Sequence, residues 1–369
     1  MKVLEMCLST GVGGLELYAV RTASQLKLRN IGCVAVVAKG TMTAERMQQN
    51  GVQTIEFEKA QRYLPVLSAR RLARIVDEEH VDVIHMHWAR DLNLAVLAKR
   101  FAKRSVKLVY TRQMMITRSK QDIYHRFLYR HVDLVLTITE QLCGLAQQYL
   151  PMSKGAIKTL YYGVEDPPVL TEQEKKDLRK SIDIPDDNFS IGMVGRVEEG
   201  KGQHLLVQAV HDLVAQGAKV HATIIGPAMN SDFETKLKTQ VDARSLAGNI
   251  CFYGSHNNPI EIMSAFDVVV LATKQETFGL VLIEAMRNGV TVIGTRAGGV
   301  PEIIDEGITG LMFEPGNSQE LTDKLLLLIN DKGLCDKLAQ AGKEKADRMF
   351  AQEQHYQQLV DFMKQLLQS

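Results

Sequence analysis

The stretch VVVLATKQETFGLVLIEAMRNGVTVIGT, residues 268–295, decides the fold of this chain. Its two ends, 268–273 and 290–295, are apolar runs that predict buried strands, and the apolar stretch between them, 280–288, predicts a helix. Strands that lack polar alternation and are joined by a helix are typical of a parallel sheet covered on both faces. The stretch therefore predicts a strand–helix–strand unit of a doubly wound α/β domain.

The same alternation of strands and helices occupies the rest of the chain in two series. A proline-containing, charged stretch at 161–180 interrupts it and predicts a linker. We therefore expect two Rossmann-like α/β domains that face a cleft, with boundaries at 1–165 and 166–349. Strands are expected at 2–8, 33–38, 81–87, 107–111, 134–139 and 157–164, and then at 188–195, 221–226, 250–254, 268–273 and 290–295.

Charge is distributed unevenly, although the net charge of the 369 residues is only +1. Residues 1–165 hold 24 Lys and Arg against 14 Asp and Glu, whereas residues 166–369 hold 20 against 29. The most basic run, 99–130, has ten Lys and Arg and a single acid, Asp122. This run is either a solvated helical face or a surface that attracts an anionic membrane or an anionic acceptor.

The five cysteines are scattered and form no C-x-x-C pair, so neither a disulfide framework nor a zinc site is indicated. A reducing, cytosolic compartment fits this pattern. The first apolar run is too short for a signal peptide, and no stretch approaches the roughly 20 apolar residues of a membrane span. We expect a protein that is soluble or bound to a membrane surface.

Two glutamates eight positions apart flank the start of the helix in the opening stretch. Glu276 lies in the loop after the strand 268–273, and Glu284 lies on the helix in an apolar sequence, where an unpartnered carboxylate is costly to bury. Ligands of open parallel sheets bind beyond the carboxyl ends of the strands, and a helix start, here with Thr277 as N-cap, binds anions. The glutamates are candidates for binding sugar hydroxyls; the alternative is an exposed Glu284 and a Glu276 that serves the helix dipole.

Two further loops follow strands of the second domain. The segment GRVEEGKG, 195–202, carries Arg196 and Lys201, and such cations are natural partners of a diphosphate. A glycine pair, Gly298 and Gly299, precedes the start of another helix. Each loop alone is compatible with an ordinary turn. Together, three loops at strand ends of one domain carry cations or helix starts that can bind anions, and they predict a phosphate-containing ligand.

The first domain has two polar motifs at strand ends. The segment STGVGGLE, 9–16, joins a strand to a helix, but its G-x-G-G pattern is not G-x-G-x-x-G, so an NAD-dependent dehydrogenase is a weak alternative. His85 and His87 end another strand. Because the spacing offers no evident third ligand, a polar role facing the cleft is favoured over a metal site. No D-x-D pair at a strand end indicates a metal for a diphosphate.

Taken together, these motifs resemble those of glycosyltransferase family 4, retaining enzymes of the GT-B fold. The resemblance covers nearly the whole chain and implies that the C-terminal helix, 350–369, packs back on the first domain. Its most specific element is the E-x7-E pair Glu276 and Glu284 within QETFGLVLIEAMRNGVTVIGTRAGGVPEII. The other carriers are GGLE at 13–16, IHMH at 84–87, YGVE at 162–165 and GRVEEGKG at 195–202.

The resemblance also implies a role for each candidate residue. Arg196 and Lys201 would hold the donor diphosphate and stabilise its charge as it leaves. Glu276 would bind hydroxyls of the donor sugar, and Glu284 would bind the nucleotide ribose. Further donor-binding residues are expected to be Gly13, Gly14, Thr277, Phe278, Gly279, Leu280, Gly298 and Gly299. Residues expected on the acceptor side are Glu16, His85, His87, Arg112 and Gln113.

One position departs from the family pattern. Similar enzymes commonly carry a histidine where this chain has Gln113, in the segment YTRQMM. Glutamine can donate and accept a hydrogen bond but takes no proton at neutral pH. The departure concerns the acceptor side rather than the class of reaction.

The resemblance implies a retaining hexosyltransferase that uses a UDP-sugar, with a GDP-sugar as second choice. The acceptor would be a glycan or glycolipid of lipopolysaccharide or another envelope polysaccharide. We expect no required cofactor, no metal and no nucleic-acid partner, and an electrostatic contact of 99–130 with the inner face of the cytoplasmic membrane. The alternatives are a nucleotide-sugar epimerase that hydrolyses its donor and a non-catalytic nucleotide-sugar-binding protein.

Overall fold

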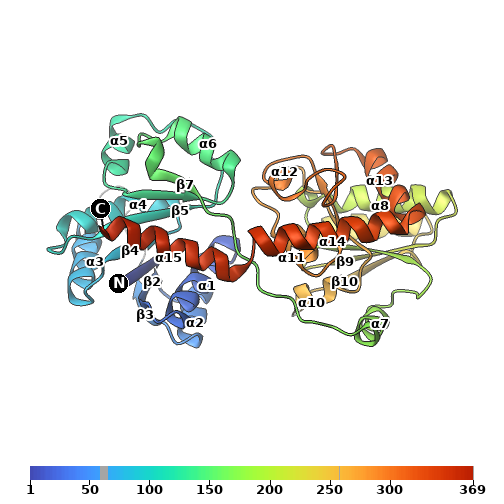
Figure 1. Cartoon of the computed structure of the whole chain (residues 1–369), viewed down its shortest axis with the longest axis horizontal. Helices are drawn as coiled ribbons and strands as arrows, with labels where there is room; N and C mark the ends of the chain where they lie inside the picture. The colour runs from blue at the N-terminus through green and yellow to red at the C-terminus, as the bar shows by residue number, and fades with distance from the viewer. Residues whose placement is uncertain (59–64, 257, 369) are drawn as a thin grey trace. The chain divides into compact units, whose positions relative to one another are not determined.

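A computed structural model describes residues 1–58, 65–256 and 258–368 and divides the chain into two compact units. Unit 1 comprises Met1–Tyr161 and Glu353–Ser369, and unit 2 comprises Tyr162–Gln352. Each unit is built on one parallel sheet with helices packed on it (Figure 1). The expected fold class, two Rossmann-like α/β domains, is confirmed. Within the described residues, no helix has the length and apolar character needed to cross a membrane.

Seven parallel strands form the sheet of unit 1, in the order β3-β2-β1-β4-β5-β6-β7. Six of them coincide with expected apolar runs. The seventh, β3, lies at the edge of the sheet and is only partly buried, so a search for apolar runs misses it. The strands are β1 (Lys2–Cys7), β2 (Gly32–Ala38), β3 (Gln53–Phe57), β4 (Val83–Met86), β5 (Lys107–Arg112), β6 (Leu134–Thr137) and β7 (Ile157–Thr159).

The C-terminal helix α15 is part of the core of unit 1. Its buried residues Tyr356, Leu359 and Met363 pack with Val3 and Val83 of the central strands, and Figure 1 shows the helix lying across this sheet. Burial of these apolar side chains stabilises the helix on the sheet. The helices of unit 1 are α1 (Gly14–Leu28), α2 (Met42–Gln49), α3 (Val66–Glu78), α4 (Leu92–Phe101), α5 (Ile123–Tyr129), α6 (Glu140–Tyr149) and α15 (Gln352–Gln368).

A buried histidine anchors α15. His355 Nδ1 donates to the carbonyl of Tyr161 at 2.6 Å, and His355 Nε2 lies 3.0 Å from the hydroxyl of Tyr18 on α1. With Nδ1 protonated, the ring is neutral, and Nε2 accepts a hydrogen bond from the Tyr18 hydroxyl. Burial lowers the pKa of His355 from 6.5 to about 4, and the hydrogen bond to Tyr161 opposes this shift only in part. The neutral imidazole is therefore the form that the fold requires.

This anchor predicts a specific pH dependence of stability. The pKa of His355 is lower in the folded chain than in the unfolded chain. The unfolded chain therefore binds more protons between pH 6.5 and pH 4. As the pH falls through that window, the contribution of neutral His355 to the free energy of unfolding is lost. At pH 7.5 His355→Gln should be less stable than the wild type. That difference should shrink by up to about 3 kcal/mol at pH 4, as measured by chemical denaturation of both proteins across the pH range. A difference that stays constant with pH would contradict the neutral anchor.

Six parallel strands form the sheet of unit 2, in the order β10-β9-β8-β11-β12-β13. The strands are β8 (Phe189–Val194), β9 (Val220–Ile225), β10 (Ile250–Gly254), β11 (Val268–Leu271), β12 (Thr291–Thr295) and β13 (Leu311–Phe313). The helices are α7 (Glu172–Ser181), α8 (Gln203–Ala215), α9 (Ser231–Ala243), α10 (Pro259–Met263), α11 (Leu280–Arg287), α12 (Val300–Ile303), α13 (Ser318–Asn330) and α14 (Lys332–Met349).

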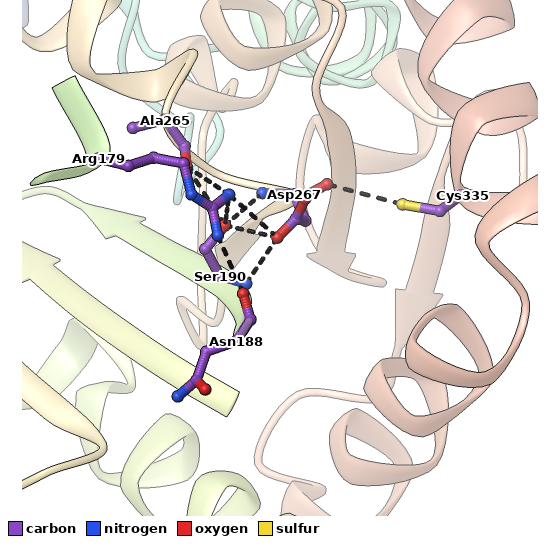
Figure 2. A network of polar contacts seen from close by, with 6 residues as sticks. All are labelled: Arg179, Asn188, Ser190, Ala265, Asp267 and Cys335. Atoms are coloured by element: carbon purple, nitrogen blue, oxygen red, sulfur yellow. Dashed lines mark hydrogen bonds and ion pairs between the residues drawn. The ribbon is translucent and has the colours of Figure 1, made fainter. Parts of the chain in front are cut away.

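The stretch expected to be a linker contains a folded helix. Helix α7 begins with a capping box in which Thr171 and Glu174 satisfy each other's backbone N–H groups. Arg179, near its end, donates to the hydroxyl of Ser190 and to the carbonyl of Asn188, both at 2.9 Å (Figure 2). The stretch that was expected to be a linker thus includes a helix that the sequence analysis did not predict, and a cap and one anchored arginine hold this helix although it has few apolar residues.

Figure 2 also shows what Arg179 is anchored to. The Asp267 carboxylate accepts the N–H and the hydroxyl of Ser190 at 2.7 and 2.6 Å, and the Cys335 thiol donates to the Asp267 carbonyl at 3.7 Å. Ser190 lies near the start of β8, and Asp267 directly precedes β11. The network therefore fixes the amino ends of the two central strands of unit 2 to α7 and α14.

Candidate active site

The sheet of unit 2 has a topological switch point between β8 and β11. From β8 the chain continues to β9 and β10 on one side, whereas β11, β12 and β13 extend the sheet on the other. Open α/β sheets bind ligands at the carboxyl ends of the strands at such a point. The loops 195–202 and 272–279 follow β8 and β11 and thus lie at this position, and the loop 296–299 follows the neighbouring strand β12.

The structure brings Lys201 and Glu276 together across the switch point. Lys201 Nζ lies 3.3 Å from Glu276 Oε2, and the N–H of Thr277 donates to Glu276 Oε1 at 3.0 Å. Both charged side chains are partly exposed. The site therefore offers a fixed carboxylate, which can accept hydroxyl protons, beside an ammonium group, which can bind phosphate oxygens.

Arg196 lies on the same loop as Lys201 but has a different partner. Its guanidinium pairs with Glu198 at 3.0 Å and its side chain is 55% exposed. Its carbonyl accepts the amide of Gln203 on α8 at 2.9 Å, which fixes the backbone of the loop. The loop position of Arg196 is thus well held, while its side chain remains accessible to a ligand.

The loop after β12 packs directly on Glu276. Gly298 adopts a φ of +59°, and a Cβ atom at this position would lie 1.6 Å from the Glu276 carbonyl oxygen. The N–H of Gly299 donates to the same carbonyl at 3.3 Å. Only glycine allows this approach, so the glycine pair predicted from sequence sets the position of the Glu276 loop.

One expectation about the start of α11 is wrong. The N-cap residue is Gly279, in the left-handed conformation with a φ of +106°, rather than Thr277. The side chain of Phe278, in the same loop, is 3% exposed and packs edge-on against Tyr162 and Phe350 at centroid distances of 5.3 and 6.0 Å. Phe278 therefore anchors the loop in the core of unit 2. Leu280 and Glu284 lie half-buried in the first turns of the helix.

Unit 1 has its own switch point, between β1 and β4. The glycine loop after β1 is held by Glu16, whose carboxylate accepts the N–H of Gly13 at 2.9 Å and the hydroxyl of Ser9. Glu16 is buried in the first turn of α1, which begins at Gly14. In this structure Glu16 thus shapes the backbone of the loop.

The two histidines expected to face the cleft are buried, so that expectation is wrong. His85 and His87 are 0% and 1% exposed, and both bind Glu5, which is the register partner of His85 on the neighbouring strand β1. The contacts are His85 Nδ1 to Glu5 Oε1 at 2.8 Å and His87 Nε2 to Glu5 Oε2 at 2.7 Å. His85 Nε2 lies 2.7 Å from the Thr111 hydroxyl. Glu5 is the third potential metal ligand, beside His85 and His87, that the sequence spacing did not reveal. The sequence feature that could have revealed it is a single acidic residue within an apolar strand.

Burial and the two histidines act in opposite directions on the pKa of Glu5. Burial alone would raise the pKa of Glu5, but His85 and His87 outweigh it and hold the pKa at about 2. Burial and the neighbouring His85 lower the pKa of His87. A carboxylate bridging two imidazoles in this way has the donor set of a metal centre. In the described structure Glu5 hydrogen-bonds both histidines, and His87 Nδ1 is buried without a hydrogen-bond partner among the described residues.

The residues after β5 and β4 complete the carboxyl edge of unit 1. Arg112 is buried and turns inward, donating to the Tyr110 hydroxyl at 3.0 Å and to the Met115 carbonyl at 3.2 Å. Gln113 is 7% exposed, and its Nε2 has no hydrogen-bond partner among the described residues.

Asp91, which sequence reasoning missed, accepts the N–H of Leu8 at 2.9 Å, and burial raises the pKa of its carboxyl to about 7.

Comparisons with known proteins agree with this geometry. Residues 12–166 match the family model described as Glycosyltransferase Family 4, and residues 174–345 match the one described as Glycosyl transferases group 1. The chain is similar to the N-acetyl-alpha-D-glucosaminyl L-malate synthase of Bacillus anthracis, with 27% identity over 77% of this chain and 75% of that protein. It is also similar to the lipopolysaccharide core biosynthesis mannosyltransferase LpsB of Rhizobium meliloti (strain 1021), with 25% identity over 76% and 79% of the two chains.

Two solved structures share the fold over almost the full length. A glycosyltransferase from Rickettsia africae ESF-5 superposes with a TM-score of 0.90 at 20% identity and covers 99% of this chain and 98% of its own. Anabaena Alr3699/HepE in complex with UDP gives a TM-score of 0.87 at 23% identity, covering 99% and 100%. The two parallel-sheet units therefore form a GT-B architecture. The chain belongs to the glycosyltransferases that combine a family 4 domain with a group 1 domain.

Proposed function

We propose that this glycosyltransferase moves a hexosyl group, with retention of anomeric configuration, from a nucleotide diphosphate sugar to a glycan or glycolipid acceptor. A UDP-sugar is the favoured donor and a GDP-sugar the second choice. The acceptor belongs to lipopolysaccharide or another envelope polysaccharide. Relatives named for lipopolysaccharide core and capsular polysaccharide biosynthesis support this setting.

The observation that carries the proposal is the Lys201–Glu276 pair at the switch point of unit 2. A diphosphate sugar presents two charged phosphates beside a ring of hydroxyls. The ammonium of Lys201 suits the phosphates, and the Glu276 carboxylate, held by the Thr277 N–H, suits vicinal hydroxyls. The half-buried Glu284 on α11 is assigned to the nucleotide ribose. Gly13 and Gly14 of unit 1 are assigned to the phosphates.

In this mechanism the leaving diphosphate is stabilised by fixed charges. Lys201 and the accessible guanidinium of Arg196 balance the negative charge that develops as the glycosidic bond breaks. Transfer then needs neither a resident metal nor a cofactor. On the acceptor side, the free amide donor of Gln113 is assigned to positioning a sugar oxygen, because it can donate a hydrogen bond but cannot act as a base. The basic first unit is proposed to work at the inner face of the cytoplasmic membrane.

A nucleotide screen tests the donor assignment. UDP, UDP-glucose and UDP-galactose are compared with GDP and GDP-mannose for their effect on thermal unfolding, with ADP as the control nucleotide. A ligand at a hundredfold excess over its Kd should raise the midpoint by about 5–10 °C. Stabilisation by the guanosine series alone would replace the UDP-sugar by the GDP-sugar, and no stabilisation by any member would contradict the donor site.

A product assay then tests the reaction itself. With the donor found in the screen, we expect a glycosylated acceptor whose new linkage has the anomeric configuration of the donor, as read from the coupling constant of its anomeric proton. Free sugar and nucleotide as sole products would identify a hydrolysing epimerase of the same fold. Tight nucleotide binding without turnover would identify a binding protein.

A further inference from the structure

Helix α5 of unit 1 carries a basic and apolar surface that the transfer site does not use. A groove of about 870 Å³ runs along the helix and is bounded on its other side by the segment 151–156. Arg100, from α4, lies over the ring of Phe127, with its guanidinium carbon 5.5 Å from the ring centroid. We call this surface the α5 patch and define it by Arg100, Ile123, Arg126, Phe127, Arg130 and Met152.

The cations of the α5 patch are not neutralised by acids. Arg100, Arg126 and Arg130 are exposed, and within the described residues none of them forms an ion pair. Arg126 donates through Nε to the carbonyl of Gln121 at 2.7 Å, which leaves its terminal nitrogens free for another partner. The nearby acid, Asp122, caps α5 and binds His125 Nδ1 at 2.6 Å. The patch therefore presents uncompensated positive charge.

The apolar part of the patch is unusually open to solvent. Ile123 is 88% exposed and Tyr124, the next residue, is 46% exposed. Phe127 and Met152 line the groove between the arginines. Removing such side chains from water is favourable by roughly 25 cal/mol per Å² of apolar surface. A partner that offers negative charge and hydrocarbon together would satisfy both features at once.

The place of the patch within unit 1 separates it from the transfer chemistry. Its lining includes Val132, two residues before β6, and Ala156, directly before β7. It therefore reaches the amino ends of these strands. The glycine loop and Gln113 lie at the opposite, carboxyl edge of the same sheet. A large partner on the α5 patch leaves that edge of unit 1 open.

We propose that the α5 patch docks the protein on a bilayer of anionic phospholipids. Ile123 and Tyr124 enter the interface, while Arg100, Arg126 and Arg130 bind lipid phosphates with their apolar stems along the groove. Helix α5 has only seven residues, so neither burial nor charge alone anchors it, and the two act together. The docking deepens the proposed function, because it brings the enzyme to a membrane-held acceptor, but binding itself needs no donor.

Vesicle binding tests the proposal with the full chain. Cosedimentation is measured with vesicles of equimolar phosphatidylcholine and phosphatidylglycerol and with vesicles of phosphatidylcholine alone. We expect binding only to the anionic vesicles, and its loss when NaCl rises from about 0.1 M to about 1 M, where the Debye length falls from about 10 Å to about 3 Å. Arg126→Glu/Arg130→Glu should weaken the partition coefficient at least about 30-fold, since each cation near an anionic surface contributes about fivefold.

Matched variants separate the patch from general charge and hydrophobicity. Lys176→Glu/Lys180→Glu makes the same charge change on exposed positions of α7 in unit 2 and should bind like the wild type. Ile123→Ser should weaken binding several-fold without a change in charge, whereas Leu67→Ser, at an 81% exposed position of α3, should not. Thermal unfolding and nucleotide binding of each variant, measured without vesicles, show that the variants fold and that the donor site is intact.

Several outcomes would overturn the docking. They are equal binding to neutral and anionic vesicles, equal loss in the α7 control, or no binding by the wild type. A salt-sensitive oligomer that Arg126→Glu/Arg130→Glu abolishes, without vesicle binding, would assign the patch to a second copy of this chain, whose residues 166–369 are acidic. If the protein fails to bind vesicles but is still stabilised by nucleotide, the docking proposal is wrong and the donor assignment is unaffected. If it binds vesicles as expected but no nucleotide stabilises it, the donor assignment is wrong and the docking proposal is unaffected.

Discussion

Glu276→Ala is expected to lower kcat for sugar transfer by about 10²–10³-fold, the loss that follows removal of one group that stabilises a transition state. The carboxylate is fixed by Lys201 and by the Thr277 N–H, so its removal deprives the donor sugar of a preorganised acceptor and releases the lysine from its partner. The loop itself should persist, because the Glu276 backbone carbonyl still accepts the Gly299 N–H. Steady-state transfer rates with the donor identified by the screen give the measurement.

Two companion variants sharpen this test. Glu276→Gln keeps an oxygen for the Thr277 N–H but removes the charge, and should be impaired less than Glu276→Ala. Glu344→Ala removes an exposed glutamate of α14 and should leave kcat unchanged. If Glu276→Ala transferred sugar at the wild-type rate with an unchanged KM, the catalytic assignment of this loop would be wrong.

Gly298→Ala is expected to damage both stability and donor binding. The added Cβ would stand 1.6 Å from the Glu276 carbonyl oxygen, and the residue has a φ of +59°, which side chains rarely adopt. The backbone strain and the forced movement together should cost unit 2 at least about 2 kcal/mol of unfolding free energy. Because the Glu276 loop must move, the thermal response to the nucleotide sugar should weaken as well.

Gly307→Ala is the matched control for this change. Gly307 also has a positive φ, +72°, but an added Cβ there meets no atom within 4 Å. Gly307→Ala should therefore lower the free energy of unfolding only by the intrinsic cost of a left-handed alanine, about 1 kcal/mol. Its thermal stabilisation by the nucleotide sugar should equal that of the wild type. Equal effects of the two substitutions in denaturation and binding would mean that the contact between Gly298 and Glu276 does not matter.

The buried strands of both sheets could be predicted from the chain because their signal is local. Runs such as 268–273 are apolar on both sides of the strand, which only a covered parallel sheet explains. The loops with Arg196, Lys201, Glu276 and Gly298 were predicted for the same reason, since each directly follows such a strand. Helix α7 and strand β3 were not predicted because their apolar content is low. A capping box stabilises α7, and pairing at the edge of the sheet stabilises β3.

Contacts between distant segments could not be read from spacing. Glu5 and His85 lie 80 positions apart, and only the pairing of β1 with β4 makes them register partners. The burial of the Phe278 ring against Tyr162 and Phe350 likewise joins segments that are distant in the sequence. Sequence position tells which loop a side chain belongs to, but its direction depends on the backbone conformation at neighbouring residues such as Gly279.

The sequence by itself determined two parallel α/β domains, the family resemblance and the three loops at strand ends of unit 2 that we propose bind the donor, because apolar periodicity and glycine-bounded turns are encoded within a few residues. Only the tertiary structure decided which charged groups meet. It placed Lys201 beside Glu276, enclosed Glu5 with two histidines and left the arginines of the α5 patch uncompensated. The physical reason is that charge pairing and burial depend on distances through space, and strand order and loop packing set those distances.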